Sequence, residues 1–359
     1  MVAVAWEPAA AGQAARQVWT PFVLVTGLLL VGLVARSDGL FDAAGDELAR
    51  RSRGGVSLFV GAAVLLAAVT AVLNLDTAVV FLTPVVVVAA RRRGVDEIPF
   101  LYLAVFMANG ASLLLPGSNL TNLIVLGHHH LVGRDFARTM APAWVAAVAA
   151  VTLTVGLLHR RHLAARAERA APPRPRPHLG AGLLGVTVAT VVVLVGSGGL
   201  MAVVVVCTGI ALAGWRLARR SLDWAEVRRT VGASVLVGLF GLAVGGGTLG
   251  RVWSGPQSLL AHLASWPTAV VGAAFAVVVN NLPAASLLAA RPPADPQALL
   301  IGLNLGPNLA VTGALSAVVW LQAARSVEAR PSVGRYSLLG LVVVPVSMAA
   351  ALAALPLGR

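Results

Sequence analysis

Residues 116–122 read Pro-Gly-Ser-Asn-Leu-Thr-Asn and interrupt the long apolar run Ile98–Leu126. Proline has no backbone N–H and cannot continue a regular helix, and glycine weakens a helix further. Four side chains just after them can form hydrogen bonds, namely Ser118, Asn119, Thr121 and Asn122. Inside a bilayer, irregular backbone is tolerated only where it faces protein or a water-filled cavity. We therefore expect a helix that is broken at Pro116 and Gly117 and carries polar groups at the break.

The composition of the whole chain places this run in a membrane. Of 359 residues, 58% are hydrophobic and only 11% are charged. A soluble domain carries about 25% charged residues, so this chain cannot cover itself for water. Apolar runs of roughly 17–25 residues, which is long enough to cross the hydrocarbon core, recur from end to end. Because backbone polar groups must be satisfied within each such segment, the predicted fold class is an all-α polytopic membrane protein with the bilayer as a partner.

The basic residues predict the topology. The formal net charge is +13, and all 27 basic residues are arginines that lie between apolar runs rather than on one face. This distribution indicates a topology signal, and we expect no nucleic-acid partner. Six arginines fall on the predicted outer side, namely Arg16, Arg134, Arg138, Arg251, Arg291 and Arg359. The other 21 fall on the cytoplasmic side, which predicts a multi-pass protein of the bacterial inner membrane with a cytoplasmic central linker.

A second interruption lies upstream, in the apolar run Val56–Ala90. Its middle holds Asn74, Leu75, Asp76 and Thr77, and arginines flank the run on both sides. Arginines at both ends place both ends in the cytoplasm. The run is therefore either two full spans or a re-entrant hairpin with its polar tip at mid-depth.

The second half of the chain repeats this order. The run Val270–Ala290 is interrupted first, and the run Leu299–Leu321 is interrupted next. The residues at these two breaks are Asn280, Asn281 and Pro283, and then Asn304, Gly306, Pro307 and Asn308. Since the first series starts outside and the second starts inside, we expect inverted repeats with a transport site at their interface.

These patterns divide the chain into four parts. Residues 1–17 form an N-terminal tail, and 18–158 form the first transporter repeat. Residues 159–178 are a basic, proline-rich cytoplasmic linker, and 179–359 form the second repeat. The second repeat opens with two spans, 179–195 and 200–215, that have no counterpart in the first.

Asp76 is the strongest single candidate for chemistry, because it alone among fourteen acidic residues lies in the middle of an apolar run. A carboxylate at this depth is costly unless it is hydrated, paired or protonated, and so marks a functional site. Low dielectric favours the protonated carboxyl, which suits proton coupling. The alternative is that Asp76 caps a helix at the hairpin tip, and the two roles are compatible.

The candidate solute-binding groups are Asp76 and the amides and hydroxyls at the breaks. The latter are Asn74, Thr77, Ser118, Asn119, Thr121, Asn122, Asn280, Asn281, Asn304, Asn308 and Thr312. One carboxylate with many neutral donors and no arginine at mid-depth fits a neutral hydroxylated solute or a cation better than a strongly charged anion. The alternatives are helix–helix hydrogen bonding for 118–122 and a plain turn for 280–283.

Other residues carry weaker signals. His128–His130 are expected at the interface rather than at a metal, and the single cysteine, Cys207, is expected to pack in an apolar run. We expect no metal and no cofactor. An intramembrane enzyme would need a nucleophile–base pair or a metal set at membrane depth, and none is evident, so we expect a protein that is not an enzyme.

Four stretches carry a resemblance to a known family. They are 73–84 (Leu-Asn-Leu-Asp-Thr-Ala-Val-Val-Phe-Leu-Thr-Pro), 108–122 (Ala-Asn-Gly-Ala-Ser-Leu-Leu-Leu-Pro-Gly-Ser-Asn-Leu-Thr-Asn), Asn280–Pro283 and Leu305–Leu309. In combination they resemble the arsenite efflux permeases, or arsenical-pump membrane proteins, of the ion-transporter superfamily, which are related to sodium–dicarboxylate symporters.

The resemblance implies two inverted repeats, each with a re-entrant hairpin and a broken helix, and a homodimer that moves by an elevator-like mechanism. It implies proton-driven efflux of arsenite and antimonite, with a cytoplasmic ATPase subunit as a further partner. The alternatives are a permease for an organic or inorganic anion, dicarboxylate among them, a cation/proton antiporter, and a purely structural subunit.

Three departures from the family pattern bear on this. The first repeat lacks the two N-terminal spans that relatives have. Ala310 stands where relatives often have threonine after Gly-Pro-Asn-Leu. The hairpin tips lack the Ser-Asn-Thr signature of sodium-coupled carriers, which favours protons as the coupling ion.

Overall fold

The computed structural model describes residues 6–127, 132–164, 180–196 and 198–359. Within these ranges every regular element is a helix. Six helical stretches of this part are long and apolar enough to cross a membrane. They are α2 (Pro8–Ser37), α4 (Gly55–Val72), α8 (Gly133–Leu158), α11 (Gly198–Ala218), α12 with α13 (Trp224–Val252) and α19 with η4 (Val333–Gly358). The all-helical fold class predicted from the composition is confirmed.

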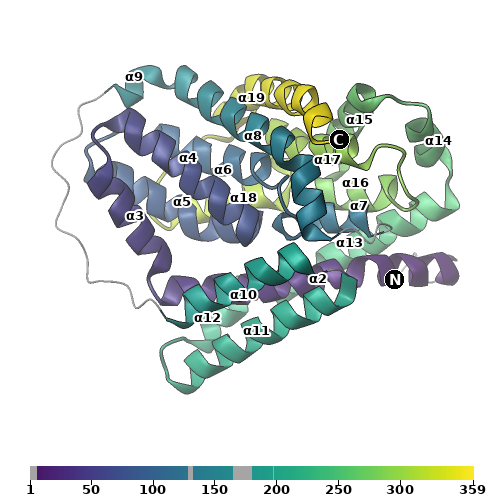
Figure 1. Cartoon of the computed structure of the whole chain (residues 1–359), viewed down its shortest axis with the longest axis horizontal. Coiled ribbons are helices and arrows are strands. Elements are labelled where there is room, and N and C mark those ends of the chain that lie inside the picture. Colours follow the sequence, from purple (N-terminus) through teal and green to yellow (C-terminus); the bar gives the residue numbers. More distant parts are fainter. Residues whose placement is uncertain (1–5, 128–131, 165–179, 197) are drawn as a thin grey trace.

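The helix ends sort to two ends of the bundle (Figure 1). The linker end, at the left of the picture, carries α3 (Leu40–Arg51) and α9 (Arg160–Leu163), which directly precedes residues 165–179. The opposite end, at the right, carries the N-terminus and α14 (Gly255–Ala261). The linker beyond Ala164 and the histidines 128–130 lie outside the described residues.

Helix α2 is the long element on which the second half packs. It begins at Pro8, ahead of the expected start at Val18, because the alanine-rich stretch 8–17 favours helix and proline suits the first helical turn. The hairpin of α10 (Ala181–Val195) and α11 lies along it (Figure 1). At Gly27 the backbones come so close that an added Cβ would lie 2.7 Å from backbone atoms of Val206.

Both predicted hairpins are present as pairs of helices. In the first half, α4 is followed by α5 (Leu75–Arg92), with the chain broken at Leu73 and Asn74. In the second half, α15 (Ser265–Val279) is followed by α16 (Asn281–Leu288), with the break at Asn280. An eight-residue helix rises only about 12 Å, too little to cross a bilayer core of about 30 Å. The re-entrant geometry itself remains a prediction.

Both predicted broken helices are also present. In the first half, α6 (Ile98–Gly110) ends well before η1 (Pro116–Ser118) and α7 (Leu120–Leu126). In the second half, α17 (Pro296–Leu305) is followed by η2 (Gly306–Leu309), η3 (Val311–Gly313) and α18 (Leu315–Arg325). The first unwound stretch starts at Ala111, earlier than predicted. Side chains from beyond the break bind its backbone carbonyls and replace the lost helical hydrogen bonds.

The two halves repeat the same contacts between elements. In each half the first hairpin helix packs on the first part of the broken helix: α4 on α6, and α15 on α17. The second hairpin helix packs on the last part of the other half's broken helix: α5 on α18, and α16 on α7. Inverted repeats predict these pairings, although the inversion itself remains a prediction.

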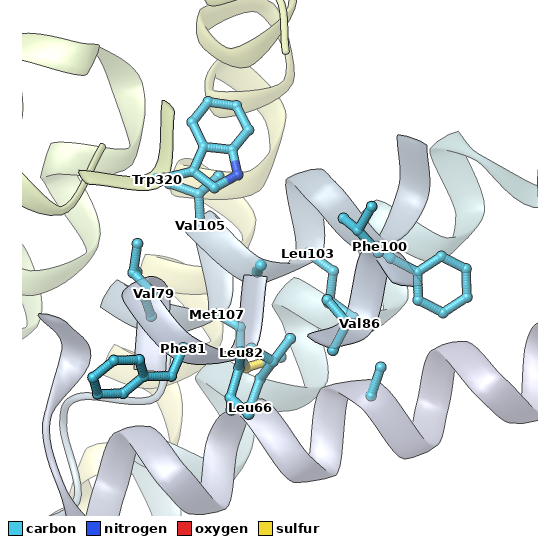
Figure 2. Close-up of a cluster of buried hydrophobic side chains, with 14 of the residues drawn as sticks. Leu66, Val79, Phe81, Leu82, Val86, Phe100, Leu103, Val105, Met107 and Trp320 are labelled. Atoms are coloured by element: carbon cyan, nitrogen blue, oxygen red, sulfur yellow. The ribbon is translucent and has the colours of Figure 1, made fainter. Parts of the chain in front are cut away.

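The core of the first half is built around α6 (Figure 2). Every residue of α6 after Ile98 is buried, including Phe100 and Met107. Side chains of α4 and α5 pack against it, and from the second half Trp320 donates from its indole N–H to the carbonyl of Leu101 at 2.9 Å. A helix that is apolar on all sides is a buried helix, so α6 is the centre of this half.

The two halves differ in how much of their long apolar helices is buried. In the most apolar stretch of α2, 78% of the residues are buried, but in that of α12 and α13 only 17% are buried. The α10–α11 hairpin accounts for this difference, because it covers α2. Although the sequence assigns this hairpin to the second repeat, it packs on the first helix of the first repeat.

A buried ion pair fixes that hairpin in place. Asp38, at the end of α2, pairs with Arg216 of α11, and the two side chains are 2% and 17% exposed. The other Asp38 carboxylate oxygen accepts the backbone N–H of Gly182 at 2.7 Å. Three helix ends therefore meet at one carboxylate.

Replacing Arg216 by methionine should destabilise the protein, because it leaves the Asp38 charge buried without a partner. Breaking a buried pair in this way costs about 3–5 kcal/mol. Thermal unfolding in detergent should show a clearly lower midpoint for R216M and substantial recovery in D38N/R216M. The control is R50M, because Arg50 pairs with Glu47 on the surface, where an ion pair is worth about 0–1 kcal/mol. Equal midpoints for R216M and R50M would contradict this structural role.

Candidate functional site

Asn304, in the last turn of α17, is the centre of a buried polar network. Its side-chain oxygen accepts from Ser112 Oγ at 3.0 Å and from Thr121 Oγ1 at 3.2 Å, and also from the Asn119 amide. Its amide N–H groups donate to Asn122 Oδ1 at 2.8 Å and to the carbonyl of Leu300 at 2.9 Å. One side chain therefore joins the broken helix of the second half to the break in the first.

A second amide pair makes the same connection nearby. The Asn109 amide donates to Asn308 Oδ1 at 2.8 Å, and the Asn308 amide donates to the carbonyl of Phe106 at 3.2 Å. From α19, the Tyr336 hydroxyl donates to the carbonyl of Pro307 at 3.2 Å. The unwound stretch η2 is thus hydrogen-bonded to α6 and to α19.

The first unwound stretch is held by its own side chains. Ser118 Oγ lies 2.6 Å from the carbonyl of Ser112, to which it donates. The Asn122 amide donates to the same carbonyl at 2.7 Å and to that of Leu115 at 3.1 Å. Buried carbonyls that lack helical partners must be satisfied in this way.

The network therefore unites most of the predicted residues at the two broken helices, namely Ser118, Asn119, Thr121, Asn122 and Asn304, with Asn308 beside them. Sequence reasoning missed Asn109 and Ser112 as site residues. Both are polar positions in an otherwise apolar run just before Pro116, and that signal would have identified them.

The hairpin tips stand apart from this network. At the first tip, Asn74 is buried and caps α5 by accepting the Thr77 N–H at 2.7 Å. At the second, Asn280 accepts the Leu282 N–H at 3.3 Å and donates to the carbonyl of Thr312 at 3.1 Å. Asn280 has φ of +77°, a conformation that asparagine tolerates better than most residues.

Three further predicted residues, two at these tips and one in η3, have no role in the network. Asn281 is buried, but its side chain has no hydrogen bond among those of the described part of the chain. Thr312 is exposed and takes part only through its carbonyl. Thr77 is buried, and its hydroxyl has no partner among the described residues.

Asp76 lines a cavity of about 740 Å³ that reaches the linker end. The same cavity is lined by apolar residues that include Val25 and Leu29 of α2, Leu120 of α7 and Leu315 of α18. Asn74 caps α5, and Asp76, two residues later in the first turn, lines the cavity instead. Leu120 lies between Asn119 and Thr121, so the inner wall adjoins the Asn304 network.

Charged residues line the cavity toward the linker end. They are Arg36, Asp42, Asp46, Arg92, Glu226 and Arg229. Asp46 pairs with Arg92, while the Arg36 guanidinium lies 5.4 Å from the centre of the Phe81 ring. Asp76 is about 24 Å from Arg92 along α5, at a rise of about 1.5 Å per residue. When Asp76 is counted with them, the lining contains three arginines and four acidic residues. The cavity therefore carries no excess of positive charge.

Comparison with known proteins identifies the family to which this chain belongs. The profile of the family described as citrate transporter (CitMHS) matches residues 2–306, which is most of the chain. The chain belongs to the citrate transporter family. The resemblance to transporters of the ion-transporter superfamily is thereby confirmed at the level of family.

Three known proteins are similar to this member of the citrate transporter family over most of its length. It is 26% identical to the arsenical pump membrane protein of Escherichia coli K12, over 95% of this chain and 86% of that protein. It is 27% identical to the protein of the same name from Yersinia enterocolitica, with the same coverage. It is 28% identical to the inner membrane protein YbiR of Escherichia coli K12, over 85% of this chain and 80% of that protein.

A solved structure supports the fold of this family member. The crystal structure of the Alcanivorax borkumensis YdaH transporter, described as having an unusual topology, matches with a TM-score of 0.61 at 18% identity. The match covers 99% of this chain and 88% of that chain. The helical bundle therefore shares its fold with that protein.

Replacing Asn304 by alanine should weaken the contact between the two halves, because three buried donors lose their shared acceptor and Asn122 loses its donor. Each polar group left buried without a partner costs about 1–3 kcal/mol. The unfolding midpoint of purified N304A in detergent should fall markedly. The control is T312A, whose exposed side chain should change the stability by less than about 0.5 kcal/mol. The proposed role of the network fails if N304A is as stable as T312A.

Proposed function

We propose that this protein is a secondary active transporter of the bacterial inner membrane that exports arsenite and antimonite in exchange for protons. The observation that carries the proposal is the cavity, in which a single carboxyl lies deep among apolar side chains. Support also comes from the similar proteins named arsenical pump membrane protein and inner membrane protein YbiR.

The charge of the cavity favours a neutral solute. Arsenous acid is uncharged at neutral pH and carries hydroxyl groups, whereas citrate carries several negative charges. Moving charged groups out of water is costly unless opposite charges meet them. The three arginines of the cavity lining are matched by three acidic residues besides Asp76, and Arg92 pairs with Asp46.

Competition for Asp76 would couple the two fluxes. The ionised carboxylate accepts hydrogen bonds from the hydroxyls of the solute with both oxygens. Protonation removes its negative charge and turns one oxygen into a donor, so the protonated carboxyl binds these hydroxyls more weakly. A proton and a solute molecule therefore exclude each other at one group. Loading with solute from the linker end and with a proton from the opposite end gives an obligatory exchange.

The broken helices would supply the remaining contacts. The first turns of α5, at the hairpin tip, and of α7, at the break, would direct partial positive charge toward the region of Asp76 and Leu120. Backbone N–H groups there that Asn74 and Asn119 do not already cap would donate hydrogen bonds to the oxygens of a neutral hydroxylated solute. The homodimer, the elevator-like motion and the cytoplasmic ATPase subunit are further parts of the proposal.

The family description supports a second candidate, which is a carrier of citrate or another carboxylate. That function predicts uptake that depends on a sodium or proton gradient and saturates with the carboxylate. The charge balance of the cavity argues against it, and the assay below separates the two.

Asp76→Asn should abolish proton-driven transport and leave folding intact, because asparagine keeps the size of the side chain but cannot bind and release a proton. Arsenite accumulation should be followed in inside-out membrane vesicles under an imposed pH gradient. The control is D42N, at the exposed part of the cavity lining, which should retain most of the activity. Normal accumulation in well-folded D76N would refute the role of Asp76.

The wild-type protein should be tested first in the same vesicle assay of arsenite accumulation. Accumulation that collapses on adding a protonophore supports a proton-driven metalloid exporter. If arsenite does not accumulate but citrate or a dicarboxylate does, the second candidate replaces the first.

A further inference from the structure

Two arginines lie side by side at the opposite end of the bundle. Arg251 is in the last turn of α13, and its side chain is partly buried. Arg291 follows α16 and is exposed. The Arg291 guanidinium donates to the backbone carbonyl of Arg251 at 3.2 Å, which fixes the two residues next to each other.

Their other acceptors are uncharged. Arg251 Nη1 donates to the carbonyl of Gly247 at 2.8 Å, and its Nη2 donates to Gln17 Oε1 at 2.6 Å. Arg291 Nη1 donates to Gln257 Oε1 at 2.7 Å. A guanidinium has five N–H donors, so each arginine keeps donors beyond these bonds.

This pair differs from the neighbouring arginines. Arg134 and Arg138 lie within ion-pair distance of Asp135, and Arg359 pairs with Asp295. In the described part of the chain, no carboxylate comes within ion-pair distance of Arg251 or Arg291. Two adjacent positive charges, one of them partly buried, repel each other and favour a bound anion.

Exposed tryptophans indicate the depth of the pair. Trp253 directly follows α13, and Trp266 lies in the first turn of α15. Each is 52% exposed. Tryptophan side chains that are exposed at the ends of membrane spans lie at the level of the lipid headgroups. The anion available at that level is the phosphate of a phospholipid.

We propose that Arg251 and Arg291 bind the phosphate group of an anionic phospholipid at the opposite end of the bundle. The planar guanidinium groups suit the paired oxygens of a phosphate, and the tails of the lipid would lie along the exposed apolar face of α13. This assignment is independent of the transported solute.

The site is joined through Gln17 to the ends of two further helices, α7 and α16. Gln17, which accepts from Arg251, donates to the carbonyl of Ile124 at 3.1 Å and to that of Ala289 at 2.9 Å. These carbonyls belong to the ends of α7 and α16. A lipid that neutralises Arg251 should therefore stabilise the fold as a whole, and the gain should appear in thermal unfolding.

The test uses the purified full chain in a neutral detergent, with added phosphatidylglycerol, phosphatidylcholine or inorganic phosphate. Phosphatidylglycerol should raise the unfolding midpoint of the wild type, and the other two should not. The variant is R291Q, an exposed change that keeps a hydrogen-bonding side chain. The control is R134Q, at the same end, where Asp135 already supplies the negative charge.

R291Q should lose most of the shift, and R134Q should keep it. Native mass spectrometry should show at least a threefold fall in bound phosphatidylglycerol for R291Q only. An equal shift and equal lipid retention in R291Q would overturn the proposal. A shift of the same size with inorganic phosphate alone would also overturn it, because the site would then take a soluble anion.

Discussion

Unwound backbone at membrane depth must find hydrogen-bond partners inside the protein, and this requirement governs the rest of the structure. Both halves contain helices that stop before they have crossed the bundle. Water is not available at that depth to satisfy the freed carbonyls and N–H groups. The chain satisfies them with amides and hydroxyls, and it brings the two breaks together so that Asn304 serves both. The contact between the halves follows from this shared need.

Much of the fold could be predicted from the sequence. The positions of the breaks at Asn74, Pro116, Asn280 and Gly306 follow from proline, glycine and polar residues inside apolar runs, and the structure has breaks at each of them. Partners in space could not be predicted in the same way. The pairing of Asn109 with Asn308 joins residues far apart in the chain, and local patterns carry no information on which polar groups will meet.

The polar character of the site could be predicted from the sequence. Which residues form the hydrogen-bonded network and which line the cavity could not. The sequence suggested one polar site made of all the breaks. In the structure the broken helices form a buried hydrogen-bonded network, and Asp76 lines a separate cavity beside it. The packing of α10 and α11 on α2 was also beyond sequence reasoning, because a membrane helix that faces lipid and one that faces another helix have similar apolar sequences.

The Asn304 network also has a consequence for biosynthesis. Its members are separated by more than 180 residues in the chain, since Asn304 binds Asn122 and Asn119. The bonds of Ser118 and Asn122 to the backbone can form within the first half, but the side chains that share Asn304 must wait for the second half to be made and inserted. Contacts of such long sequence separation form late. During that interval the Asn119 N–H groups and the Asn122 side-chain oxygen lack their Asn304 partner and can bind wrong ones. The newly made first half is therefore the stage at which this protein is most vulnerable to misassembly and quality control.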